Sequence, residues 1–241
     1  MKNKLANSFF LWNYFGIDVD SIPAEILDAV INIAYSDATK RKSVDRSGMN
    51  EQEIEEDKKN ARDVVWFAIY NLYPDIVFST WHEEVCRDLV SKTAFSYGNA
   101  QKLLNMTIKY LYLLSTSGML PSRESYEFYD WYDYRLKAFE AQFHVPIDNY
   151  VLQYIYEDMK KNNTHWGEKE LIGIRKYHPQ YKIKDYSDKS EYAWSKLPDY
   201  ETYMMIQRAT VSCYKPKNPL EWENNIWIDI AKKRKRETSI N

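Results

Sequence analysis

The sequence of 241 residues has few of the features that mark metal, redox, nucleotide-binding or membrane proteins. Its two cysteines, Cys86 and Cys213, fit no metal-ligand spacing, so we expect both thiols to be reduced and buried. No P-loop, GxGxxG element, internal repeat or strand-rich segment occurs. No run of about 18 apolar residues is present, and residues 9–15 lack the form of a signal peptide. We therefore expect a soluble protein of the cytoplasm that does not enter a membrane.

The charge is also nearly balanced. The formal net charge of −2 gives no overall basic field, so any nucleic-acid surface has to be a local patch. One candidate is the basic run KKRKR at residues 232–236, which we expect to be a tail that either contacts phosphate or is solvated.

Helical periodicity accounts for most of the chain, and 44% hydrophobic residues are ample for a core. The sequence predicts an all-α protein, one domain over residues 1–241 made of two helical lobes. An aromatic cluster between Phe9 and Phe15 should pack onto the core as an N-terminal arm. Helices are predicted at residues 23–35, 51–73, 78–91, 99–114, 123–143, 149–159, 198–214 and 220–231.

A histidine beside two glutamates, His82-Glu83-Glu84, suggests a metal site at first sight. Adjacent helical residues point about 100° apart, however, and no second histidine follows four residues later. The pattern favours a surface histidine, and we predict no metal site.

A lysine follows a glycine-bearing turn in SYGNAQKLLNMTIKYLYLL, residues 96–114. Lys102 and Lys109 are seven residues apart and share a helix face to within about 20°. Two interpretations are open. Both lysines face solvent, or the apolar surroundings provide a dry site for one reactive amine.

An aspartate opens a later helix in HVPIDNYVLQYI, residues 144–155. Pro146 keeps Val145 extended, and Asp148 is well placed to be the N-cap of the helix that begins at Asn149. Asp148 therefore either caps the helix and does nothing more, or also presents a carboxylate to a substrate.

These two stretches, GNAQKLLNM and VPIDNYVLQYI, resemble the helix-hairpin-helix (HhH-GPD) DNA glycosylase superfamily, of the 8-oxoguanine DNA glycosylase and archaeal AGOG type. In that family a hairpin glycine precedes a lysine by four residues, and Val-Pro-Val-Asp opens a later helix. Carried over, Lys102 falls on the nucleophile, Asp148 on the catalytic aspartate and Gly98 on a hairpin glycine that helps to hold a phosphate. Ala100 stands where the family has its second hairpin glycine, and the gap between the two motifs is longer than usual.

The resemblance implies a two-lobed helical fold, with the hairpin and catalytic helices at about residues 79–160 and the active site in the cleft between the lobes. It implies a DNA glycosylase, with AP-lyase activity, that acts as a monomer on duplex DNA carrying a flipped base, without metal or cofactor. DNA contacts are expected from Gly98, Asn99 and Gln101. Candidates for the base pocket are His144, Trp131 and Trp166.

Two other functions fit the same sequence. One is a non-catalytic helical binding or adaptor protein, in which Lys102 lies on the surface and Asp148 only caps. The other is a helical nucleic-acid-binding protein that uses residues 232–236 and performs no chemistry.

Overall fold

The computed structural model describes residues 4–40, 43–120, 126–161 and 194–238. Helices form the regular structure of these ranges, which contain no strand, so the all-α prediction is confirmed. The chain divides into two compact units. Unit 1 comprises Met1–Ala94 and Leu103–Glu140, and unit 2 comprises Phe95–Lys102 and Ala141–Asn241.

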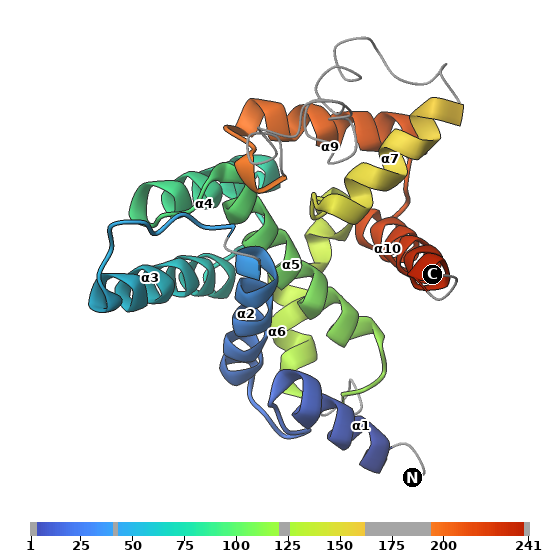
Figure 1. The fold of residues 1–241 in the computed structure, drawn as a ribbon. Coiled ribbons are helices and arrows are strands. Elements are labelled where there is room, and N and C mark those ends of the chain that lie inside the picture. The colour runs from blue at the N-terminus through green and yellow to red at the C-terminus, as the bar shows by residue number, and fades with distance from the viewer. Residues whose placement is uncertain (1–3, 41–42, 121–125, 162–193, 239–241) are drawn as a thin grey trace. The chain divides into compact units, whose positions relative to one another are not determined.

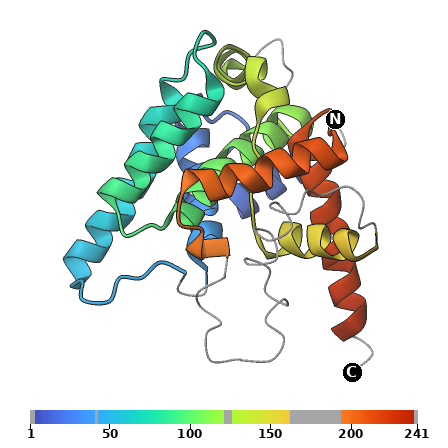
Figure 2. The same ribbon diagram turned by 90° about the horizontal axis from the view of Figure 1, so that it is seen from above.

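Unit 1 is built from short and long helices that enclose an apolar core. Two of them, α3 (Glu51–Tyr70) and α4 (Phe78–Lys92), pack side by side, as both ribbon views show (Figures 1 and 2). The others are α1 (Lys4–Phe10), the π-helix η1 (Leu11–Phe15), α2 (Pro23–Thr39), most of α5 (Tyr97–Thr116), α6 (Glu127–Arg135) and most of the 3-10 helix η4 (Lys137–Gln142). Fully buried core residues include Leu11, Ile26, Val30, Ile69, Leu89, Leu103, Leu111 and Tyr132.

Local capping explains where these helices begin. The Asn50 side chain accepts the Glu53 backbone N–H at 3.0 Å, and the Glu53 carboxylate accepts the Asn50 N–H at 2.8 Å, which closes a capping box at the start of α3. Pro23 opens α2, where its missing N–H costs nothing. The predicted helix over residues 123–143 is shorter in the structure, because α6 ends at Arg135 and the chain continues as η4.

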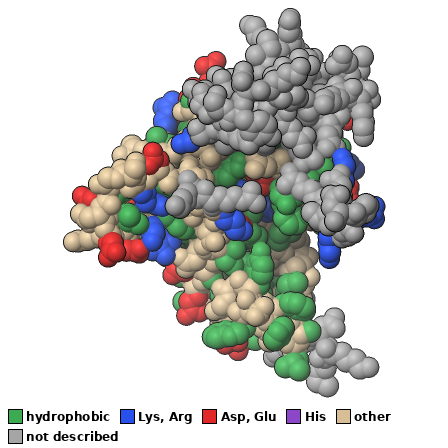
Figure 3. Space-filling view, viewed as in Figure 1, with side chains coloured by type: hydrophobic (Ala, Val, Ile, Leu, Met, Phe, Trp, Pro, Cys, Tyr) green, Lys and Arg blue, Asp and Glu red, His purple; other side chains and the backbone are tan. Residues whose placement is uncertain are grey.

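The N-terminal aromatic residues differ from the prediction. Phe9, Phe10, Trp12 and Tyr14 are each more than half exposed, and the buried residue of this segment is Leu11. Figure 3 shows hydrophobic side chains gathered on the surface of the part of unit 1 that carries α1. The arm therefore packs on unit 1 through Leu11 and through edge contacts of the Tyr14 and Phe15 rings with Tyr110, while the Phe9, Phe10 and Trp12 rings are largely exposed.

His82 is a second correction. It was predicted on the surface, but it is fully buried, with Nε2 2.8 Å from Oδ1 of Asn105 and Nδ1 3.8 Å from Sγ of Cys86. Among the described residues, no group of three or more His, Cys, Asp or Glu side chains could hold a metal ion. Cys86 is buried as predicted, whereas Cys213 is partly exposed.

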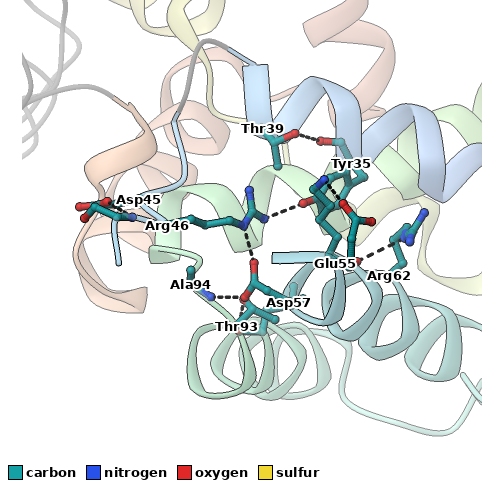
Figure 4. A network of polar contacts seen from close by, with 12 residues as sticks. Tyr35, Thr39, Asp45, Arg46, Glu55, Asp57, Arg62, Thr93 and Ala94 are labelled. Atoms are coloured by element: carbon teal, nitrogen blue, oxygen red, sulfur yellow. Dashed lines mark hydrogen bonds and ion pairs between the residues drawn. The ribbon is translucent and has the colours of Figure 1, made fainter. Parts of the chain in front are cut away.

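A largely buried polar network joins several segments of unit 1, including its residue Ala94 (Figure 4). Asp57 Oδ2 accepts from Nε of Arg46 at 2.7 Å, and Asp57 Oδ1 accepts the backbone N–H of Ala94 at 2.6 Å. Arg46 also donates to the Tyr35 hydroxyl at 2.6 Å. The network connects the 43–49 loop with α2, with α3 and with Ala94.

Unit 2 contains the first residues of α5, then α7 (Asn149–Lys161), the 3-10 helix η6 (Trp194–Lys196), α9 (Tyr200–Tyr214) and α10 (Pro219–Thr238). Helices α7 and α10 pack together, with the Tyr150 and Trp227 ring centroids 5.1 Å apart. The basic run 232–236 is the last part of α10 and so is helical, where a tail was expected. Within the described ranges, no helix has the length and hydropathy needed to cross a bilayer.

Candidate active site

Lys102 lies in the second turn of α5, in a part of the helix with almost no solvent access. Ser96 precedes the helix, and its Oγ accepts the Asn99 N–H at 3.2 Å, which fixes the first turn. Lys102 is 8% exposed, and Lys109, on the same helix, is 5% exposed. The interpretation that both lysines face solvent is therefore wrong.

Asp148 caps α7, as predicted, with one of its two carboxylate oxygens. Oδ1 accepts the backbone N–H groups of Tyr150 at 2.8 Å and Val151 at 3.1 Å. Oδ2 lies 3.5 Å from Nζ of Lys102, and the two side chains are 10% and 11% exposed. The cap thus fixes one oxygen and leaves the other facing the amine.

Trp194 completes the immediate surroundings of the amine. Nζ of Lys102 lies 4.2 Å from the centroid of the Trp194 ring, a cation–π contact. Trp194 comes from η6 and is 8% exposed. An ammonium ion held by a carboxylate on one side and an aromatic face on another is confined to a small volume.

The three residues all belong to unit 2, although they come from distant parts of the sequence. A buried ion pair is costly to form, because both charges lose their hydration and the attraction between them only partly compensates. The helix amides on Asp148 Oδ1 and the Trp194 face on Lys102 offset part of that cost. A buried amine and a carboxylate that face each other are a candidate for chemistry.

The three residues predicted to contact DNA are buried and engaged within the protein. Gly98 donates its N–H to the Leu197 carbonyl at 3.3 Å, and Ser96 Oγ lies 2.7 Å from Asn99 Oδ1. The Gln101 amide bonds to the backbone of Gly98 and Ile147. A role in holding DNA stays a prediction for these residues, whereas their role in packing is visible.

The three residues proposed for the base pocket have different surroundings. His144 is partly exposed, and its Nδ1 lies 2.9 Å from the Tyr203 hydroxyl. Trp131 belongs to unit 1, where its ring packs near Tyr70 and Phe128 with centroids 6.4 and 6.0 Å apart. Trp166 lies outside the described residues.

Sequence reasoning did not assign Trp194 to the site. The residue lies far along the chain from Lys102 and in a one-turn helix, so no periodic pattern connects the two. The one local signal is Gly98, whose missing side chain leaves room for the backbone of residues 194–195. A glycine in the first turn of an apolar helix indicates a close neighbour, but not which one.

A groove lies on the surface of unit 1. It runs along α3 and α4 and combines acidic and apolar side chains, and none of its lining residues belongs to the Lys102 site. The residues that line it include Asp63, Val64, Phe67, Trp81, Glu84 and Val85.

Comparison with protein-family models, with curated proteins and with solved structures found no match to this chain.

Proposed function

We propose that the protein is a DNA glycosylase with AP-lyase activity that removes a damaged or modified base by means of Lys102 and Asp148. The observation that carries the proposal is the 3.5 Å approach of the Lys102 amine to Oδ2 of Asp148 in a site where both side chains are about nine-tenths buried. The geometry brings together the two residues whose motifs resemble those of the glycosylases, across 46 positions of sequence, the difference between 148 and 102.

Asp148 would act on the bond between base and sugar. When the C1′–N bond breaks, its electron pair leaves with the base and positive charge develops on the sugar ring. A fixed carboxylate stabilises that charge without the reorganisation that water would need. Oδ1 of Asp148 is held by two helix amides, so Oδ2 is already oriented before the substrate arrives.

Lys102 would form the covalent bond. The base departs with the electron pair of the C1′–N bond and takes one proton from the Lys102 ammonium. The amine so formed attacks C1′, and the nitrogen of the new C1′–N bond passes its second proton to Oδ2 of Asp148. Opening of the sugar ring gives a Schiff base. Loss of a proton from C2′ then expels the 3′ phosphate and cuts the strand, and water releases the enzyme.

The substrate is duplex DNA with one nucleotide turned out of the stack. Extrusion costs a few kcal/mol and is easiest for a damaged or mismatched base. The last turns of α10 present exposed basic side chains that suit contacts with phosphates: Lys232, Lys233, Lys235 and Arg236. The proposed enzyme is a cytoplasmic monomer, and the route uses no metal or cofactor.

A second candidate function is nucleic-acid binding without chemistry. The same exposed basic residues at the end of α10 favour it, because they require no reactive lysine. In that case the Lys102–Asp148 pair is structural.

Borohydride trapping tests the proposal. The protein is incubated with duplexes that carry different lesions, and reduction captures any Schiff base as a covalent protein–DNA adduct. The adduct should disappear in Lys102→Gln and persist in Lys109→Gln, a buried lysine on the same helix. No adduct and no nicking across the panel, or an adduct that survives Lys102→Gln, would refute the assignment.

Salt dependence separates the second candidate. Replacement of Lys232, Lys233, Lys235 and Arg236 by alanine should reduce the slope of log affinity against log salt by up to about 4 if each contacts a phosphate. Binding that depends on these four residues and is unchanged in Lys102→Gln, in a protein that forms no adduct, would favour binding without catalysis.

A further inference from the structure

Two glutamine side chains hold the short extended segment that leads to Asp148. Gln101, on α5, donates from Nε2 to the Ile147 carbonyl at 3.1 Å, and its Oε1 accepts the Ile147 N–H at 3.3 Å. Gln207, on α9, donates to the Val145 carbonyl at 2.6 Å, and its Oε1 accepts the Val145 N–H at 3.1 Å. Each side-chain amide therefore forms hydrogen bonds with both the N–H and the carbonyl of one backbone residue, as a neighbouring β-strand would.

The segment needs such partners. Val145 and Ile147 are fully buried, and the described ranges of the chain contain no strand to pair with them. A buried backbone group without a partner costs about 1–3 kcal/mol. Pro146, between the two clamped residues, has no N–H to satisfy. Gln101 is fully buried and Gln207 is 3% exposed, so their amides do not compete with water for these bonds.

The order of residues connects the clamp to the site. Gln101 immediately precedes Lys102, and Ile147 immediately precedes Asp148. The hydrogen-bonded pair 101–147 is thus next in sequence to the ion pair 102–148 on both segments, α5 and the stretch that precedes α7. Any shift of the segment relative to α5 changes the distance between amine and carboxylate.

We propose that Gln101 and Gln207 are positioning residues that set the place of Asp148 relative to Lys102. This inference rests on the proposed glycosylase function and adds to it the residues that fix the geometry. The alternative is that the glutamines only satisfy buried backbone groups, with no effect on the site beyond stability.

The test uses Gln101→Met and Gln207→Met, which keep the side-chain volume and remove the amide. Thr210→Val is the matched control. Thr210 is fully buried on α9, one turn from Gln207, and its hydroxyl bonds only to the Ile206 carbonyl among the described contacts, at 2.8 Å. This control loses a buried hydrogen bond and keeps the four bonds that Gln101 and Gln207 make to Val145 and Ile147.

The first readout needs no DNA. Amide hydrogen exchange of Tyr150 and Val151 reports whether Asp148 still caps α7. We expect exchange at these two amides to be at least about tenfold faster in both Gln→Met variants than in Thr210→Val. The variants are compared under conditions in which their global free energies of unfolding are equal. Unchanged exchange in the Gln→Met variants would overturn the proposal.

The second readout separates the two chemical steps. Base excision requires the carboxylate near the sugar, whereas trapping on a preformed abasic site requires only the amine, because no glycosidic bond has to break. We expect excision to fall by about 10²-fold in the Gln→Met variants, as for a misplacement of about 1 Å, and abasic-site trapping to fall much less. An equal loss in both assays, or the same loss of excision in Thr210→Val, would mean that the glutamines act only through stability. If the wild type neither excises nor traps, the proposed function fails, and the exchange readout still decides whether the glutamines hold Asp148.

Discussion

Gly98 lies directly against the backbone of Trp194. A Cβ at Gly98 would be 2.0 Å from the Trp194 carbonyl oxygen and 2.9 Å from Cα of Ser195. The Gly98 N–H also donates to the Leu197 carbonyl. The absence of a side chain lets η6 approach α5 closely enough for the Trp194 ring to reach the Lys102 amine.

Gly98→Ala should therefore destabilise the protein, although Gly98 lies in a helix. Helix propensity alone would favour alanine by about 1 kcal/mol. A contact of 2.0 Å with a backbone atom cannot be relieved by a rotamer change, and overpacking costs about 1–3 kcal/mol or more. Urea unfolding should show a net loss of stability, together with a lower yield of trapped adduct as Trp194 moves.

Ala100→Gly, two residues along the same helix, is the control. It should lose about 1 kcal/mol through helix propensity and about 1 kcal/mol more through loss of a buried methyl group. It should leave η6 in place, so that its trapping yield stays close to wild type. A Gly98→Ala protein as stable as the wild type would show that η6 does not pack against α5 as described.

Asp148→Asn separates helix capping from catalysis. Asparagine caps a helix as well as aspartate does, so the Tyr150 and Val151 bonds should remain while the charge is lost. Base excision should fall by about 10²–10³-fold, the usual cost of removing one preorganised electrostatic group. Asp148→Ala should lose the same activity and a further ~1 kcal/mol of stability from the cap.

The free energies of unfolding of Asp148→Asn and Asp148→Ala are best compared in proteins that also carry Lys102→Gln. Without that second substitution, each variant leaves the buried lysine without the carboxylate that it faces. If Asp148→Asn excises bases at the wild-type rate, the carboxylate has no part in catalysis and Asp148 only caps α7.

The sequence was informative where structure is decided locally. Pro146 and Asp148 predict an extended residue followed by a capped helix, and the structure shows that cap. The bounds of α4 and α9 follow from apolar periodicity and agree with the prediction to within two residues. Each of these features depends on neighbours a few positions away.

Long-range packing could not be predicted in the same way. Residues 97–112 of α5 are all buried, so this stretch has no solvent face, and the helical spacing of Lys102 and Lys109 carried no information about exposure. His82 was wrongly placed on the surface, because its partner Asn105 lies on another helix. Trp194 was missed for the same reason.

His82 should make stability depend on pH. Burial lowers the pKa of His82 to about 4, and the hydrogen bond with Asn105 opposes this only in part. The folded state therefore binds the proton less tightly than the unfolded state, whose histidine has a pKa of about 6.5. The contribution to stability is complete above pH 6.5 and is lost as pH falls from 6.5 to 4. By pH 5 the loss amounts to about 2 kcal/mol.

His82→Gln is the matched variant, since glutamine can still bond to Asn105 but does not titrate between pH 4 and 7. Urea unfolding at pH 7 and pH 5 should show a smaller loss for His82→Gln than for the wild type, by about 2 kcal/mol. Equal losses would mean that His82 is protonated in the folded protein at pH 5.

The ion pair of Arg46 and Asp57 should matter far more than ion pairs on the surface. The Arg46 and Asp57 side chains are 16% and 5% exposed, so Arg46→Met leaves a buried carboxylate without its cation and should cost about 3–5 kcal/mol. Adding Asp57→Asn removes that charge and keeps an acceptor for the Ala94 N–H, so the double variant should be more stable than Arg46→Met alone.

Lys92→Met provides the comparison, because the Lys92–Asp88 pair has the same 2.7 Å separation but is more than half exposed on both sides. Its cost should be below about 1 kcal/mol. Equal losses of stability in Lys92→Met and Arg46→Met would contradict the burial of the Asp57 network. A larger loss in Arg46→Met that the second substitution partly restores would show that desolvation of the carboxylate, and not the ion pair as such, sets the cost.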